Sequence, residues 1–328
     1  MSLSPQSPAA TSTAARSPVS ERPVTHYVLL NTNAGTANAT GVTAESLGEL
    51  FEASGLAATI DADGDRPLAE RIDAAMASGA PTIVAAGGDG TITALAATLV
   101  GTDRNLAILP LGTVNALAKD LHVPLDLPAA VAALATGVAH RIDVGEVNGR
   151  VFLHKVVVGL IPGLAAGREH IRGRYDAAAK IGFLRYMFRR LARARRIAVV
   201  IQPSQGERRV ERVQAIAVSS NAYDEGLGQF FSRHVLDGGT LTLYVLRHLN
   251  VGDFLRLTAS MLLGHWQHDE ALTMESVQSV TIDSRKSLLK VMFDGEVENL
   301  QTPLNFTIRP RSLSVIVPAE HATPAEAA

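Results

Sequence analysis

The chain has 328 residues, a length that suggests about two domains. Of these residues, 47% are hydrophobic and 19% are charged, which is an ordinary globular composition. The absence of cysteine excludes a disulfide framework, thiolate zinc sites and cysteine nucleophiles, and it fits a reducing cytosol. No apolar run approaches the roughly 20 residues that span a bilayer, and the first residues lack the apolar stretch of a secretory signal.

The formal net charge of −2 conceals an uneven distribution of charge. Residues 168–212 hold 13 Lys and Arg against 4 Asp and Glu, a net charge of +9. The rest of the chain holds 17 basic against 28 acidic residues, a net charge of −11. We therefore expect one basic surface on an otherwise acidic protein.

The first half of the chain alternates predicted strands and helices. Residues 1–23 are rich in Ser, Ala, Pro and Thr and predict a disordered tail, after which residues 24–139 form the first domain. Strands separated by helices favour an α/β, Rossmann-like domain in which helices cover both faces of a parallel sheet. The predicted strands lie at 25–31, 82–86 and 105–109, and the predicted helices at 43–54, 67–78, 91–100, 114–121 and 128–135.

From residue 140 onward, short strands and polar turns predominate. Asn148-Gly149 within the segment VGEVNGRVFLHKVVVGL is a strong hairpin signal. Residues 140–318 therefore predict a mainly antiparallel β-sandwich domain with inserted helices, and residues 319–328 a second disordered tail. Further strands are predicted at 196–202, 211–219, 240–246, 278–283, 288–294, 304–309 and 313–317, and helices at 176–195 and 251–264.

Two glycine turns of the first domain indicate a phosphate site. GGDGT at 87–91 and LGT at 111–113 each leave an apolar strand and enter a helix, so their backbone N–H groups lie at the positive end of a helix dipole. Both turns fall at the carboxyl edge of the predicted sheet, where ligands of such folds bind. A tight turn without a ligand is the alternative for either one alone. Neither GxxxxGK[ST] nor GxGxxG is present, which excludes a Walker loop and disfavours a dinucleotide redox cofactor.

A turn late in the chain adds two carboxylates. Asp294-Gly295-Glu296 follows a predicted strand and could be a solvent-exposed hairpin turn of type I′. The same two carboxylates could hold Mg²⁺ or accept a proton from a hydroxyl group, provided that the fold returns this turn to the cleft between the domains. The residues alone leave both interpretations open.

Taken together, these segments resemble the diacylglycerol kinase catalytic superfamily, which includes bacterial lipid kinases, sphingosine kinases and ceramide kinases. The resemblance rests on GGDGTITAL, ILPLGTVNALAKDLHVP and FDGE in this order, supported by NTNAGT at the start and LDGGTLTLYVLRH at 236–248. It covers residues 24–318. GGDGT alone also occurs in NAD kinases and phosphofructokinases, whereas the other segments make the match to lipid kinases specific.

The resemblance implies a set of site residues. Glu296 would be the general base for the lipid hydroxyl, Asp89 would lie beside the transferred phosphoryl group, and Asp294 would assist through Mg²⁺, with Asp89 and Asp294 near the metal. The residues that would line the ATP site are Asn31, Gly35, Gly87, Gly88, Asp89, Gly90, Thr91, Gly112, Thr113 and Asn115.

Two positions depart from bacterial relatives. Asn115-Ala116 stands where many of them have Asn-Asp, although sphingosine and ceramide kinases share the sequence Asn-Ala-Leu-Ala. Gly238 occupies the place of an aspartate that holds a structural Mg²⁺ in some bacterial relatives, which leaves Asp237 as the adjacent carboxylate.

The basic segment at 168–212 includes a stretch, 177–196, with apolar residues near one helical face and arginines on the rest. It could be a core helix with a solvated basic face, or it could attract the protein to anionic lipid. Nucleic acid is disfavoured because no recognised binding motif accompanies the basic residues.

The sequence therefore predicts an ATP- and Mg²⁺-dependent lipid kinase, cytoplasmic and peripheral to the membrane. Diacylglycerol, a sphingoid base or ceramide, and phosphatidylglycerol remain open as acceptors, and a homodimer remains open as well. A soluble-substrate kinase of the NAD-kinase type and a catalytically inactive nucleotide- or lipid-binding regulator are the alternative functions.

Overall fold

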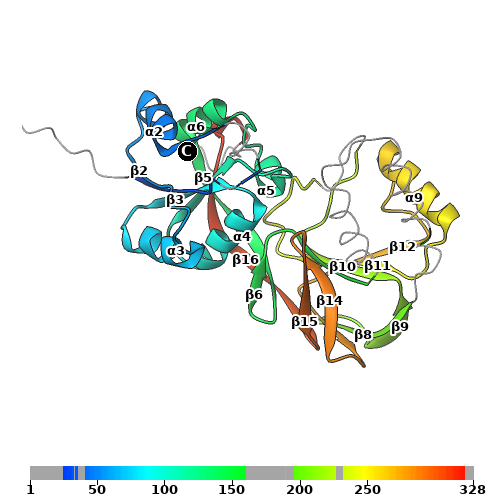
Figure 1. Ribbon diagram of the computed structural model, residues 1–328. Helices are drawn as coiled ribbons and strands as arrows, with labels where there is room; N and C mark the ends of the chain where they lie inside the picture. The colour runs from blue at the N-terminus through cyan, green and yellow to red at the C-terminus, as the bar shows by residue number, and fades with distance from the viewer. Residues whose placement is uncertain are drawn as a thin grey trace, which may run out of the picture.

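The computed structural model describes residues 25–32, 34, 35, 41–159, 189, 196–226 and 232–321. They form two lobes, one built on a parallel sheet with helices and one built from antiparallel strands (Figure 1). The predicted tail at 1–23 lies outside the described residues, and so does the predicted helix at 176–195 apart from Arg189. No helix in the described part of the chain is long and apolar enough to cross a bilayer.

The first lobe is the predicted α/β structure. Strands β2, β1, β3 and β4 lie side by side in that order and run parallel, with helices above and below them (Figure 1). Because the sheet is covered on both faces, all six residues of β3 are buried. The elements in chain order are β1 (His26–Leu30), α2 (Ala44–Ala53), β2 (Ala58–Asp61), α3 (Leu68–Ala77), β3 (Thr82–Gly87), α4 (Asp89–Leu99), β4 (Asn105–Pro110), α5 (Ala116–Asp120) and α6 (Leu127–Thr136).

Two long strands connect the lobes. β5 (Val138–Val147) and β16 (Leu304–Val317) pair antiparallel along most of their length. The last part of β16 also pairs in parallel with β4, and its first part pairs with β13 (Ser279–Ser284) of the second lobe. A ten-stranded sheet therefore continues from one lobe into the other. The sequence predicted two strands where β16 is one, interrupted by a register shift between Arg309 and Leu313.

The second lobe is the predicted antiparallel sandwich. A six-stranded sheet with the order β12-β11-β10-β7-β14-β15 packs on the β16-β13-β8-β9 part of the other sheet, and their inner faces share one apolar core. The predicted strand at 211–219 is two strands, β9 and β10. The remaining elements are β6 (Arg150–Phe152), β7 (Lys155–Gly159), β8 (Ile197–Pro203), β9 (Arg209–Val213), β10 (Ala215–Ser220), β11 (Leu241–Leu246), α9 (Val251–Leu263), β12 (Leu272–Val277), β14 (Leu288–Phe293), β15 (Glu296–Gln301) and the 3₁₀ helix η1 (Ala319–His321).

Both predicted hairpin turns have the backbone of a tight type I′ connection. Asn148 and Gly149, between β5 and β6, have φ values of 49° and 80°. Asp294 and Gly295, between β14 and β15, have φ values of 44° and 102°. Because a type I′ turn needs positive φ at both central positions, Asn-Gly and Asp-Gly are the residue pairs that favour it.

Candidate active site

Three loops meet at the carboxyl edge of the parallel sheet. The amide Nδ2 of Asn31, after β1, donates to Oγ1 of Thr91 at 3.1 Å. A Cβ atom on Gly112, after β4, would lie 2.6 Å from the Cα atom of Gly88, and one on Gly35 would lie 2.9 Å from Oγ1 of Thr113. Such distances leave no room for a side chain, so glycine is required where the loops touch. The structure thus brings the predicted loop residues together, while their contacts with a nucleotide remain a prediction.

Asn115 closes the loop after β4. It adopts the left-handed conformation, with φ of 52°. Its Oδ1 accepts from the backbone N–H of Gly112 at 2.8 Å, and its Nδ2 donates to the carbonyl of Gly112 at 2.9 Å. Asparagine suits this position because it tolerates the left-handed region and can bond to nearby backbone. The side chain of Asn115 therefore shapes the loop, and its predicted place in the lining of the ATP site stays a prediction.

The carboxylate of Asp89, in the middle of GGDGT, is held by the neighbouring loop. Oδ2 accepts from the backbone N–H of Asn115 at 3.1 Å, and Oδ1 accepts from that of Ala116 at 2.7 Å. These N–H groups begin α5, so Asp89 acts as a cap for a helix other than its own. Two amide donors offset its negative charge, and each oxygen retains a further lone pair.

Asp294 anchors the turn between β14 and β15. Its buried carboxylate accepts from the backbone N–H groups of Leu153 at 2.7 Å, His154 at 2.9 Å and Lys155 at 3.0 Å. Burial raises the pKa of this carboxyl group, and the three amide donors oppose that shift. Three of about four acceptor positions are thus used within the protein, so the observed role of Asp294 is to fix the β6–β7 connection. Its predicted part in catalysis or Mg²⁺ binding stays a prediction.

The turn also returns Glu296 to the glycine loops, as the lipid-kinase hypothesis required. A Cβ atom on Gly90 would lie 3.5 Å from Oε1 of Glu296. Glu296 is exposed, and its carboxylate makes no hydrogen bond or ion pair with the described residues. A carboxylate of the second lobe therefore faces the GGDGT loop of the first.

Between the lobes lies a cavity of about 300 Å³. Its lining includes apolar side chains, among them those of Ile92, Val114, Leu117 and Met292. Polar side chains line it as well, among them those of Asp89, Lys119, Asp120, His154, Lys155 and Asp294. The cavity thus combines apolar surface with charged and polar groups.

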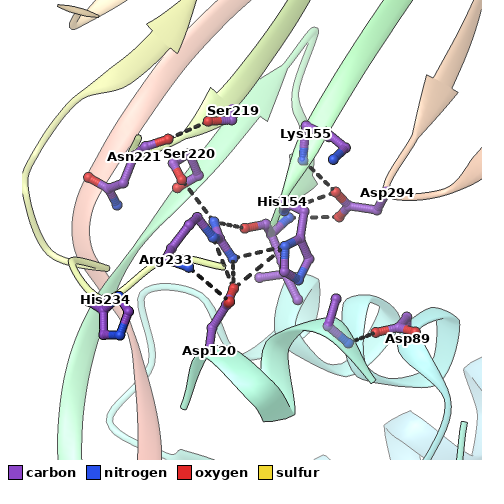
Figure 2. A network of polar contacts seen from close by, with 12 residues as sticks. Asp89, Asp120, His154, Lys155, Ser219, Ser220, Asn221, Arg233, His234 and Asp294 are labelled. Carbon is purple, nitrogen blue, oxygen red and sulfur yellow. Dashed lines mark hydrogen bonds and ion pairs between the residues drawn. The ribbon is translucent and has the colours of Figure 1, made fainter. Parts of the chain in front are cut away.

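The sequence did not single out the ion pair at this cavity. Asp120, at the end of α5, pairs with Arg233 at 2.7 Å, and both side chains are almost fully buried. The guanidinium also donates to the carbonyl oxygens of Leu153 and Ser220, each at 2.8 Å (Figure 2). The pair therefore joins α5 of the first lobe to the β6–β7 connection and the end of β10 in the second. The only sequence signal is a pair of adjacent charged residues, Lys119 and Asp120, in the otherwise apolar helix end ALAKDL.

The same arginine sets the protonation of His154. A guanidinium nitrogen of Arg233 lies 3.0 Å from Nδ1 of His154, and because arginine can only donate, Nδ1 is the acceptor. A carboxylate oxygen of Asp120 is 3.7 Å from the same nitrogen, too far to compete for it. Burial, together with the charges of Arg233 and Lys155, holds the pKa of His154 well below its usual value, so the ring is neutral.

Lys155 contributes a cation to the wall of the cavity. Its Nζ atom lies 4.7 Å from the centre of the Tyr223 ring. Burial and the charge of Arg233 lower its pKa to about 8, while Asp294 and Asp120 act in the opposite direction. Lys155 is thus charged at neutral pH and loses its charge just above it.

Asp237 lies apart from this cavity. Its carboxylate pairs with Arg311 at 3.1 Å. A Cβ atom on Gly238 would lie 2.9 Å from Oδ1 of Asn221, so the backbone at this glycine is closely packed. Within the described ranges, no three His, Cys, Asp or Glu side chains are arranged to hold a metal ion.

Known proteins resemble the chain in both lobes. Residues 25–147 match the model of the diacylglycerol kinase catalytic domain, and residues 168–317 match that of the YegS C-terminal NAD kinase beta sandwich-like domain. The chain is 24% identical over 249 residues to the diacylglycerol kinase of Bacillus subtilis (strain 168), a match that spans 73% of this chain and 78% of that protein. It is 29% identical over 253 residues to a Pseudomonas fluorescens protein named probable lipid kinase YegS-like, spanning 76% and 81% of the two chains.

A solved structure shares the fold. The crystal structure of a diacylglycerol kinase from Bacillus anthracis str. Sterne has a TM-score of 0.64 and 19% identity to this chain, with 92% of this chain and 98% of that chain covered. The two-lobed architecture described above is therefore the architecture of that protein as well.

Proposed function

Because the chain belongs to the diacylglycerol kinase catalytic-domain family and carries a YegS-type C-terminal domain, we propose that it is a lipid kinase that uses ATP. It transfers the γ-phosphoryl group to a lipid hydroxyl group. Diacylglycerol is the first acceptor to test, because the relative from Bacillus subtilis and the solved structure from Bacillus anthracis are both named diacylglycerol kinases. Ceramide, a sphingoid base and phosphatidylglycerol are the other acceptors with a hydroxyl group beside apolar chains.

The observation that carries this proposal is the position of Glu296 opposite the GGDGT loop. The glycine loops offer backbone N–H groups to the phosphates of ATP, as helix N-termini with such loops do. The lipid hydroxyl oxygen attacks the γ-phosphorus while Glu296 accepts the hydroxyl proton. The bond from the γ-phosphorus to the bridging oxygen breaks, and ADP leaves with its electron pair.

Mg²⁺ fits the carboxylates of the site. This ion is usually bound by one or two carboxylates together with the phosphates of the substrate, so a protein cluster of three ligands is not needed. Asp89 faces the cavity and retains acceptor lone pairs after capping α5, and it is the residue that would hold the ion. Mg²⁺ would supply positive charge that offsets the charge of the phosphates.

The apolar part of the cavity supports a lipid as the acceptor. Val114, Leu117 and Met292 line the same cavity as Asp89, so an apolar chain can contact them while its hydroxyl group lies near the carboxylate. A soluble, charged substrate of the NAD-kinase kind would leave these side chains in contact with polar groups.

The test is incubation of the protein with labelled ATP, Mg²⁺ and each lipid, followed by chromatographic separation of the products. We expect Glu296→Gln to lose most of the activity, roughly 10²-fold or more, because the proton acceptor is removed. Glu298→Gln is the matched control, since Glu298 lies on the same strand and pairs with Arg150 at 2.6 Å. Near-normal turnover of Glu296→Gln would contradict its role, and ATP binding without phosphoryl transfer to any lipid would identify a regulator instead.

A further inference from the structure

Helix α9 is apolar on two opposite faces, although none of its residues is buried. Toward the protein, the partly buried side chains of Phe254, Leu257 and Met261 pack on small apolar clusters of the second lobe. A helix on the surface of a globular protein normally turns polar residues outward, opposite its apolar face. The opposite face, at helical spacing, presents Val251, Leu255, Ala259, Leu262 and Leu263 to the outside.

The four large side chains of this outer face are conspicuously exposed. The exposed fractions are 36% for Val251, 54% for Leu255, 55% for Leu262 and 62% for Leu263. They make up four of the nine large exposed hydrophobic side chains among the described residues, and the other five are spread over the rest of the chain. Single exposed apolar residues are ordinary, whereas a group of them on one surface marks an interaction site.

The helix that carries this face is well defined. Asn250 and Asp253 form a capping box at its beginning, with donor–acceptor distances of 2.9 and 3.1 Å. Gly264, with φ of 74°, ends it in the left-handed conformation. Figure 1 shows α9 at the outer edge of the second lobe, away from the parallel sheet. The fold thus holds the leucines of the outer face outward in a fixed arrangement.

The charges of α9 favour an apolar partner. Its two charged residues are Asp253 and Arg256, and the guanidinium of Arg256 pairs with Asp269 at 3.0 Å and with Asp253 at 3.4 Å. A charged protein surface would find no uncompensated charge on this helix to bind. Aliphatic side chains without a free charge suit the acyl-chain boundary of a bilayer, where burial of apolar area drives binding.

A second copy of the chain fits this face less well. The four exposed side chains supply roughly 400 Å² of apolar area, about half of the 800 Å² per partner that a standard protein interface buries. A helix lying flat on a bilayer has no such requirement, since each methylene group that enters the apolar layer contributes by itself.

The inner face of α9 is continuous with the candidate active site. Leu257 and Met261 pack on a cluster of three rings, in which Tyr244 lies 5.9 Å from Tyr223 and 5.9 Å from Trp266. Tyr223 also lines the cavity between the lobes. A surface bound through α9 would therefore stand one aromatic layer away from the cavity.

We infer that the outer face of α9 docks on a lipid bilayer, with its aliphatic side chains in the region between headgroups and acyl chains. The identification of the partner as a bilayer rests on the proposed function, because a lipid kinase must reach a substrate held in a membrane. The docking itself needs neither ATP nor turnover.

The test is flotation of the full-length protein with vesicles of uncharged phosphatidylcholine, without nucleotide. It is done in about 0.5 M salt, where charges are screened beyond a few ångströms. We expect the wild-type protein to float and Leu255→Glu/Leu262→Glu to bind at least about tenfold less, because a carboxylate opposes entry into the apolar layer. The matched control is Leu125→Glu/Leu288→Glu, whose side chains are 54% and 57% exposed but lie elsewhere; it should bind within about twofold of the wild type.

Two outcomes would overturn the inference. The first is equal flotation of wild type and Leu255→Glu/Leu262→Glu. The second is a wild-type dimer in light scattering that Leu255→Glu/Leu262→Glu converts to a monomer, because the face would then belong to a second copy. Emission of the single Trp266, which packs behind α9, reports whether each variant is folded. Docking that depends on α9 without phosphorylation of any lipid would leave this inference standing and refute the kinase.

Discussion

The glycine loops of the first lobe and the buried ion pair between the lobes, Asp120 with Arg233, achieve close contact by opposite means. At the loops, backbone meets backbone because side chains are absent, as where Gly88 and Gly112 touch. At the ion pair, one large side chain, Arg233, fills the space and satisfies Asp120 and two carbonyl oxygens at once. The first device depends on sterics and the second on charge, so they should fail differently when altered.

The largest loss of stability should come from breaking the ion pair. Arg233→Met would leave Asp120 buried without its partner, which costs about 3–5 kcal/mol of unfolding free energy. Denaturant unfolding measures this loss. Asp120→Asn/Arg233→Met should recover part of it, because no charge then remains buried alone. A single variant as stable as the wild type would show that the pair contributes nothing.

A smaller loss should follow from a methyl group in the glycine contact. Gly112→Ala places Cβ 2.6 Å from the Cα atom of Gly88 and 2.7 Å from Oδ1 of Asn115, so the two loops must separate. Overpacking of this kind costs about 1–3 kcal/mol, and ATP binding should be lost along with it. Gly149→Ala, where no atom lies within 4 Å of the added group, controls for the loss of glycine itself, although its positive φ carries a strain of its own. Calorimetric titration with ATP would reveal retained binding, which would contradict the steric argument.

A still smaller change in stability is expected at Asp89, the charged residue within the glycine loops. In Asp89→Asn only one side-chain oxygen remains to accept from the two amides of Asn115 and Ala116, so about 1 kcal/mol of stability is lost, as in other helix caps. Most of the kinase activity should disappear while the protein stays folded. Thermal unfolding and the lipid phosphorylation assay measure the two effects separately. Near-normal turnover would remove Asp89 from the proposed mechanism.

The last prediction concerns Lys155, whose contribution to stability changes with pH. Its pKa is lowered to about 8 in the folded protein, against about 10.4 in an unfolded chain. Between these values the folded state has released a proton that the unfolded chain still binds, so this group makes the protein more stable as pH rises. If the cation assists phosphoryl transfer, kcat/KM should fall over the same range with an apparent pKa of about 8.

Lys155→Arg separates these effects, because arginine stays charged. The fall in kcat/KM above pH 8 should then move to higher pH. An unchanged pH profile would assign the fall to another group. Lys290→Arg, on the solvent-exposed side of β14, is the control for the substitution alone.

The sequence predicts the glycine loops but not the Asp120–Arg233 ion pair, and the reason is physical. GGDGT and LGT carry their information locally, since a glycine after a strand reports a turn that needs no side chain. Arg233 and Asp120 are 113 residues apart, and nothing in either neighbourhood indicates the other. Glu296 is an intermediate case. The turn that precedes it is readable from the local sequence, whereas its position at the cleft is implied only by the family resemblance.

Three strands that the sequence does not predict share one property, their place at a sheet edge. β2, β12 and β15 each lie at the edge of a sheet. Edge strands bury little, and β15 has a single buried residue, Leu300. Alternation of apolar and polar residues arises from burial of one face, so a strand held mainly by backbone pairing leaves a weak pattern. β7, in contrast, is central and apolar, and the sequence pattern does not separate it from the hairpin that precedes it.

The path of β16 has a consequence for the newly made chain. Residues Ser314 and Val315 complete the parallel sheet next to β4, which ends at Pro110. A ribosome adding about 5–20 residues per second needs on the order of 10–40 s to pass from one to the other. During that time the growing polypeptide exposes one side of β4 as an unfinished edge, open to pairing with other chains. The first lobe is thus the first to be translated and among the last to be closed.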